Sequence, residues 1–149
     1  MLAATRPDDW DLSLVVHVGG AMLLVGALVG AVGVMAGALR RGEDAAALTG
    51  LAFRALLLGV LPSYVVMRAG AEWIASKEGL GDSDLAWIGI GYSTADGGLL
   101  VAIIATVLAW RAGRRRGGPG GAGRAVVVLS ALLLIAYAVA IWAMTTKPS

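Results

Sequence analysis

The chain has 149 residues, of which 58% are hydrophobic and 15% are charged, and its mean hydropathy is +0.81. A soluble domain of this length has too little interior to bury so much apolar surface. The sequence has no cysteine, which excludes disulfides, thiol catalysis and thiolate metal sites, and its one histidine, His17, excludes an intrachain site built on two imidazoles. The composition therefore predicts a single-domain, all-α membrane protein.

Four apolar stretches divide the sequence, and each is near or above the ~20 residues that carry a helix across a bilayer. They are Leu12–Leu39, Leu48–Met67, Trp87–Trp110 and Ala125–Met144. We expect spans over about 12–39, 48–73, 87–110 and 125–144, which together make a polytopic four-helix transmembrane bundle. The first stretch is longer than the ~7–15 apolar residues of a signal peptide and follows acidic residues, so we expect a retained helix.

The distribution of basic residues predicts the orientation of the bundle. Four spans bring both termini and the second connection to one end, which holds four of the twelve basic residues. The other end holds Arg40, Arg41, Arg54, Arg111, Arg114, Arg115, Arg116 and Arg124. Short basic loops stay cytoplasmic, so we expect a multi-pass protein of the cell membrane with both termini outside. Tryptophans favour membrane interfaces, and they fit this orientation: Trp10, Trp73, Trp87 and Trp142 fall at outer ends and Trp110 at an inner end.

The first span contains a stripe of glycines that predicts close helix packing. Its members lie within about 60° of one another on a helical projection: Gly19, Gly26, Gly30, Gly33 and Gly37. Small residues let another helix approach closely. The partner is either a helix of the same chain or a second copy in a homodimer or larger membrane complex. His17 lies roughly opposite the stripe, where it either sits among headgroups or serves as a ligand or proton carrier.

The second span contains Pro62, which predicts an irregular helix because proline removes a backbone donor. Arg54 and Arg68 are separated by about 20 Å of helix, less than the ~30 Å hydrocarbon core. At least one of them must therefore snorkel to the surface or face the bundle interior. Tyr64, Arg68 and Glu72 form an i, i+4, i+8 row near the outer end of this span.

The third span contains Asp96. The segment from Gly97 to Trp110 is too short to cross a bilayer, so the helix should begin earlier and include Asp96 in its outer part. The alternative is a helix that begins at a break near Ser93, with Asp96 as its N-cap.

The third connection, Arg111–Arg124, reads as a flexible, glycine-rich basic loop. It predicts a topology anchor, or a surface that attracts anionic lipid through Arg111, Arg114, Arg115 and Arg116. No aromatic residue interleaves these arginines, so we expect no nucleic-acid partner.

Six polar side chains are expected in the outer half of the bundle, at similar depth. They are His17, Tyr64, Arg68, Glu72, Asp96 and Tyr137. An ionisable group inside a membrane costs a few kcal/mol, so each needs a partner. We expect a polar ligand pocket in which Arg68 pairs with Asp96 or Glu72 and His17 pairs with a carboxylate. A local Arg68–Glu72 pair at the end of the helix is the simpler alternative.

The segment from His17 to Gly26, His-Val-Gly-Gly-Ala-Met-Leu-Leu-Val-Gly, resembles the opening helix of copper-resistance-D-like and related small integral-membrane families. His17, Ala21 and Gly26 are in register with that pattern, whereas Leu24 replaces its usual tryptophan and Ala27 its second glycine. The resemblance covers about ten residues of one helix. It implies that His17 is a metal ligand, for haem b or for copper.

The sequence contains no nucleophile elbow, P-loop or metalloprotease pair, which favours a non-enzymatic protein. Three functions follow from the residues. The first is an integral membrane protein that binds a small ligand in its outer polar pocket, or serves as a membrane subunit of a complex. The second is a haem- or copper-associated redox or transport protein that uses His17. The third is a small dimeric proton-coupled transporter that uses Asp96.

Overall fold

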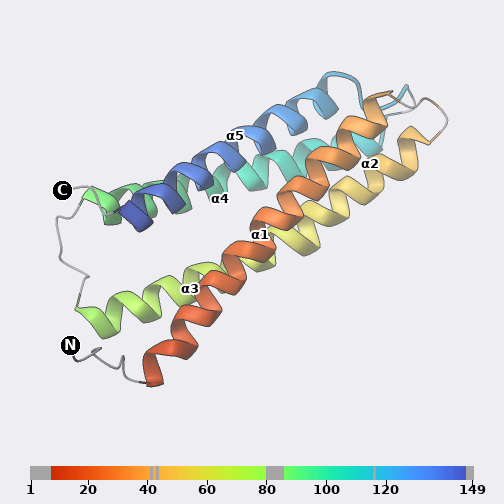
Figure 1. Cartoon of the computed structure of the whole chain (residues 1–149). Coiled ribbons are helices and arrows are strands. Elements are labelled where there is room, and N and C mark those ends of the chain that lie inside the picture. The colour runs from red at the N-terminus through yellow and green to blue at the C-terminus, as the bar shows by residue number, and fades with distance from the viewer. Residues whose placement is uncertain (1–7, 41, 43, 80–85, 116, 147–149) are drawn as a thin grey trace.

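The computed structural model describes residues 8–40, 42, 44–79, 86–115 and 117–146, and within them all regular structure is helical (Figure 1). The elements are α1 (Asp8–Arg40), α2 (Ala45–Arg54), the π-helical η1 (Ala55–Val60), α3 (Leu61–Glu78), α4 (Ala86–Gly113) and α5 (Gly120–Thr146). Arg41, Arg116 and the side chains of Trp10 and Trp87 lie outside the described part of the chain, so the expectations placed on them are not addressed.

Four segments of the described chain are long and apolar enough to cross a membrane, as predicted. They are Leu12–Arg40, Ala45–Lys77, Ile88–Gly113 and Gly120–Thr146. Each helix extends a few residues beyond its predicted end. The third connection is consequently shorter than expected, because Arg111 belongs to α4 and Arg124 to α5.

Helix α4 begins at Ala86, ten positions before Asp96, so the alternative that made Asp96 a helix N-cap is wrong. Gly89, Gly91 and Ser93 do not interrupt the helix. In lipid, a break would leave backbone donors and acceptors without water to satisfy them, and this outweighs the weak helical preference of glycine and serine.

The irregularity expected at Pro62 takes the form of a π-helical segment just before it. The backbone N–H of Leu61 donates to the carbonyl of Leu56, five residues back instead of four. Proline at position 62 has no N–H and its ring crowds the preceding turn, so a wider turn upstream relieves the crowding while the span continues. Elements α2, η1 and α3 therefore form one continuous membrane-length helix.

The interior face of α4 is built from small residues, and most of its large aliphatic side chains point outward. On α4 the buried positions are Ala95, Ala102, Ala105, Ala109 and Ala112, while Leu100, Ile103, Ile104 and Val107 are exposed. In water, exposed aliphatic side chains would be unfavourable. Lipid is as apolar as leucine, so in a membrane the helix face that packs most closely turns inward. The two long side chains Leu28 and Met35 of α1 fill the space between these alanines and the other helices.

Glycines on two antiparallel helix pairs allow the closest contacts. A Cβ atom added to Gly20 of α1 would lie 2.5 Å from the backbone N of Met67, and one added to Gly70 of α3 would lie 2.5 Å from the backbone N of His17. The backbones of α1 and α3 thus touch at this crossing. On α4, Gly91 and Gly98 likewise make room for Met144 and Tyr137 of α5.

The predicted glycine stripe of α1 does not supply these contacts. A Cβ atom added to Gly19, Gly26, Gly30 or Gly33 would meet no atom of another described residue within 4 Å, and Gly37 only approaches Leu48. The within-chain alternative is therefore wrong for the first four glycines, because α1 turns Gly20 and its leucines inward instead. Packing of the stripe against a second copy stays a prediction.

The helices form two pairs that diverge toward one end. Helix α1 packs mainly on α3 and α4 on α5, whereas α3 and α4 contact each other only slightly. Figure 1 shows the α1/α3 pair and the α4/α5 pair separating toward the end where α1 begins and α5 ends. We call this the open half, and we call the half near the α1–α2 and α4–α5 connections, where the pairs converge, the closed half.

Tryptophan and basic side chains pair at both ends of the bundle. The Lys77 ammonium lies 5.2 Å from the ring centroid of Trp73 in the open half, and the Arg114 guanidinium lies 4.2 Å from that of Trp110 beside the α4–α5 connection. Both pairs have i, i+4 spacing on exposed helix surfaces. Amphipathic pairs of this kind suit the headgroup regions on the two sides of a bilayer.

Candidate functional site

The open half contains a cavity of about 260 Å³ between the two helix pairs. All four spans contribute to it, and its walls are mostly apolar, with alanine, isoleucine and methionine side chains predominating. The polar side chains that line it are His17, Arg68, Tyr92, Thr94 and Tyr137. Its volume lies just below the roughly 300–1,000 Å³ of sites for drug-sized ligands. A small molecule, or the head of a longer lipid-soluble one, matches this space.

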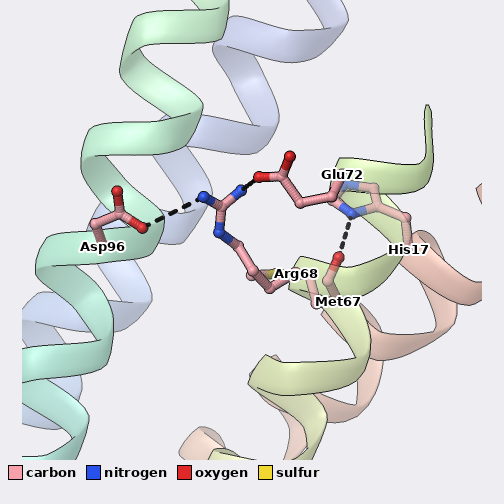
Figure 2. Close-up of polar contacts among 5 residues, drawn as sticks. All are labelled: His17, Met67, Arg68, Glu72 and Asp96. Atoms are coloured by element: carbon pink, nitrogen blue, oxygen red, sulfur yellow. Dashed lines mark hydrogen bonds and ion pairs between the residues drawn. The ribbon is translucent and has the colours of Figure 1, made fainter. Parts of the chain in front are cut away.

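Arg68 connects α3 to α4 across the mouth of the cavity (Figure 2). Its guanidinium is paired with Glu72, one turn along α3, and a second nitrogen lies 3.7 Å from Oδ1 of Asp96 on α4. The guanidinium carbon also lies 4.5 Å from the ring centroid of Tyr92. The two pairings that the sequence offered as alternatives for Arg68 thus occur together.

The three charged side chains differ in their exposure, which separates their roles. Arg68 is 26% exposed, whereas Glu72 and Asp96 are 52% and 66% exposed. Arg68 lines the cavity, while the two carboxylates hold it from outside the cavity wall. Arg54, the other basic residue of this span, is exposed on α2 and contributes nothing to the cavity.

His17 is held by a backbone carbonyl and not by a carboxylate. Its Nδ1 lies 2.9 Å from the carbonyl oxygen of Met67, and Figure 2 shows the ring directed toward that atom. The glycine crossing accounts for this contact, because Gly20 and Gly70 bring the backbones of α1 and α3 together on both sides of it. A carbonyl oxygen only accepts, so Nδ1 is the donor in this contact, and a ring that carries its proton on Nδ1 alone has its lone pair on Nε2.

Of the two remaining predicted site residues, one lines the cavity and the other does not. Tyr137 lines the cavity, and its hydroxyl occupies the space left by the missing side chain of Gly98. Tyr64 is buried in the apolar core and does not line the cavity. The structure therefore brings His17, Arg68 and Tyr137 to the cavity wall, places Glu72 and Asp96 around Arg68, and leaves Tyr64 out.

Metal-binding groups around the cavity are few. Within the described residues, no group of three or more His, Cys, Asp or Glu side chains could hold a metal ion. The cavity does, however, join His17 with Met67 and Met144, which come from three different helices. An imidazole with thioethers is a soft donor set that suits copper(I) better than a hard cation.

Sequence reasoning missed several residues of the site. Tyr92 precedes Asp96 by one helical turn, and Thr94 precedes it by two residues. The one-turn spacing places Tyr92 on the same helix face as Asp96, and it could have identified Tyr92 as a neighbour of Arg68. Gly70 stands alone and Gly98 follows Gly97, and neither belongs to a repeat of glycines, so the sequence carries no clear signal for their role. Met67 and Met144 line the same cavity because of the arrangement of all four spans, which the sequence does not show.

The basic surface at the closed end stays a prediction. Arg111, Arg114 and Arg115 are exposed, and Arg114 stacks on Trp110. This arrangement suits both a topology anchor and contact with anionic headgroups.

No family model, curated protein or solved structure matches this chain. The interpretation of the site consequently rests on its geometry and chemistry.

Proposed function

We propose that this chain is a multi-pass membrane protein that binds a small, lipid-soluble ligand in the cavity of its open half. The observation that carries the proposal is the combination of apolar walls from four spans with a few polar side chains among them. Sites for small molecules have this character. The slight contact between α3 and α4 supports lateral access from the lipid, because little packing has to be broken there.

The proposed orientation places the open half, with both termini, on the outer side of the cell membrane. The eight basic residues near the opposite end support it, since short basic loops stay in the cytoplasm. The cysteine-free sequence makes the test simple. A membrane-impermeant maleimide should label Lys77→Cys on intact cells and Arg114→Cys only after permeabilisation. The reverse pattern would invert the proposed topology.

Filling the cavity tests the binding function. Ala140 lines the cavity and Ala138, on the same helix, is exposed. Native mass spectrometry of protein released from detergent should show a small lipophilic probe such as methyl decanoate bound to the parent chain and to Ala138→Leu. Ala140→Leu should bind much less of it. Equal binding by both variants would remove the cavity as the site.

A second candidate function, a copper-associated membrane protein, is favoured by the lone pair on Nε2 of His17 and by the two methionines of the same cavity. Metal-binding histidines commonly donate their other N–H to a carbonyl, as His17 does to Met67. Copper(I) titration should show one site in the parent chain and a large loss of affinity in His17→Ala. Met22→Leu, which changes an exposed methionine, is the control. Equal affinity in both variants would exclude this candidate.

A further inference from the structure

The polar lining of the cavity is rich in hydrogen-bond donors and carries no carboxylate among the described residues. Arg68 offers a guanidinium with five N–H donors; Glu72 pairs with one terminal nitrogen and Asp96 lies near the other, so further N–H groups remain for a ligand. Tyr92 and Tyr137 add hydroxyl groups that can donate. Beside Arg68 a ligand therefore meets mainly donors, and the polar group that it places there should be an acceptor.

The charge around Arg68 decides which kind of acceptor fits. One guanidinium faces two carboxylates, so the ionised cluster of Arg68, Glu72 and Asp96 carries a net charge of −1. An incoming carboxylate would make the net charge of the cluster −2, in an environment where charges are weakly screened. An incoming ammonium group would instead meet the guanidinium, the charged group that actually lines the cavity. Each ion is thus attracted by one part of the cluster and repelled by another, whereas a neutral acceptor is repelled by neither.

We infer that the ligand of this cavity is an uncharged, lipid-soluble carbonyl compound, a ketone, ester or quinone, whose oxygen accepts hydrogen bonds from Arg68 and the neighbouring tyrosines. This inference rests on the proposed function and names its ligand class. The carbonyl oxygen gains a charge-assisted hydrogen bond without adding charge to the cluster. The rest of the molecule lies against the apolar walls formed by residues such as Ala21, Ile74 and Ile141.

The loose Arg68–Asp96 contact makes the inference testable by charge. At 3.7 Å this contact is an ion pair without hydrogen-bond geometry, and Asp96 is the most exposed member of the cluster. Replacing Asp96 with asparagine removes one negative charge and brings the cluster to neutrality. The variant should then accept a carboxylate that the parent chain excludes, while the carbonyl compound binds as before.

The experiment compares four probes with similar chains by native mass spectrometry: methyl decanoate, decane, decanoate and decylamine. At about pH 9 the acid and the amine are both charged. The parent chain should bind methyl decanoate about tenfold more tightly than decane, as expected for one hydrogen bond to a charged donor. It should bind decanoate and decylamine more weakly than the ester. Asp96→Asn should raise decanoate binding, and Arg68→Gln should abolish the preference for the ester over decane.

The outcomes separate this inference from the proposed function. If decane binds as tightly as methyl decanoate, the cavity holds lipid-soluble molecules but the carbonyl assignment is wrong. If decanoate or decylamine binds more tightly than the ester in the parent chain, the charge argument is wrong. If no probe binds, including decane, the proposed function itself fails. Asp96→Asn changes an exposed side chain, so it keeps the test valid even if Arg68→Gln does not fold.

Discussion

The helices pack differently in the two halves of this bundle. In the closed half, alanines such as Ala105 and Ala109 let four spans converge around Leu28 and Met35. In the open half, the helices stay in two pairs, each joined by glycines, and the space between the pairs holds the cavity and the Arg68 cluster. Small residues thus serve convergence in one half and tight pairing in the other.

This difference shows how a short chain can hold charged groups at membrane depth. In the open half each pair is joined by its own glycines, α1 to α3 at Gly20 and Gly70, and α4 to α5 at Gly91 and Gly98, while α1 also packs on α5. The space between them can therefore hold the ion-pair cluster, and we expect the fold to be stable without these ion pairs. Four tests, from the largest expected effect to the smallest, examine this separation.

The α1–α3 crossing should be the most sensitive point. Gly70→Ala places a methyl group against the backbone of His17, and overpacking of this kind costs about 3 kcal/mol where backbone atoms must move. Gly26→Ala, which meets nothing, should be neutral or gain up to about 1 kcal/mol from helix propensity. Unfolding in mixed micelles measures both, and equal stabilities would show that the crossing is not where the pair is fixed.

Added volume should be tolerated in one half only. Ala105 is fully buried in the closed half, so Ala105→Leu should cost about 2 kcal/mol through overpacking. Ala140→Leu grows into the cavity and should cost less than about 1 kcal/mol, since space is present there. Thermal unfolding in detergent compares them. A larger loss for Ala140→Leu would contradict the assignment of open and closed halves.

Removal of the His17 ring should have a moderate effect. His17→Ala loses the hydrogen bond to the Met67 carbonyl, which is worth about 1 kcal/mol. Because the Met67 carbonyl belongs to a continuous helix, the pair should remain joined through its glycines. A loss as large as that of Gly70→Ala would show that the ring, and not the backbone contact, holds α1 to α3.

The smallest change in stability is expected for Asp96→Asn. Its carboxylate is largely exposed and lies 3.7 Å from Arg68, so the pair should contribute no more than about 1 kcal/mol. Spin labels on Lys77 and Trp142 should report the same distance between α3 and α5 in this variant as in the parent. An increase would mean that the ion pair keeps the two helix pairs together.

Much of the fold follows from hydropathy alone, because the length of an apolar stretch is a direct measure of whether it can span lipid. The four spans and the position of Asp96 inside its helix were predictable for this reason. Glu72 and Asp96 were predicted as alternative partners of Arg68, since intramembrane charges need partners, and the structure shows both contacts.

The identity of the packing glycines was not predictable in the same way. The repeating stripe of Gly26 and its neighbours gives a strong pattern but faces outward, whereas Gly20 and Gly70 belong to no such repeat and form the crossing. Which helix face turns inward depends on the pairing of all four spans, and the partner of His17 depends on that pairing too. The spacing of residues within one span indicates neither the inward face of the helix nor the partner of His17.

Chemical accessibility of single cysteines tests the division into two halves most directly, because the parent chain has none. Cysteines would replace Ala21 and Ala140, which line the cavity, and Ala31 and Ala105, which are fully buried in the closed half. With a small, lipid-soluble maleimide, the first two should react readily in membranes, and methyl decanoate should protect them, while the last two should stay unmodified. Equal reactivity at all four positions would contradict the presence of a cavity confined to the open half.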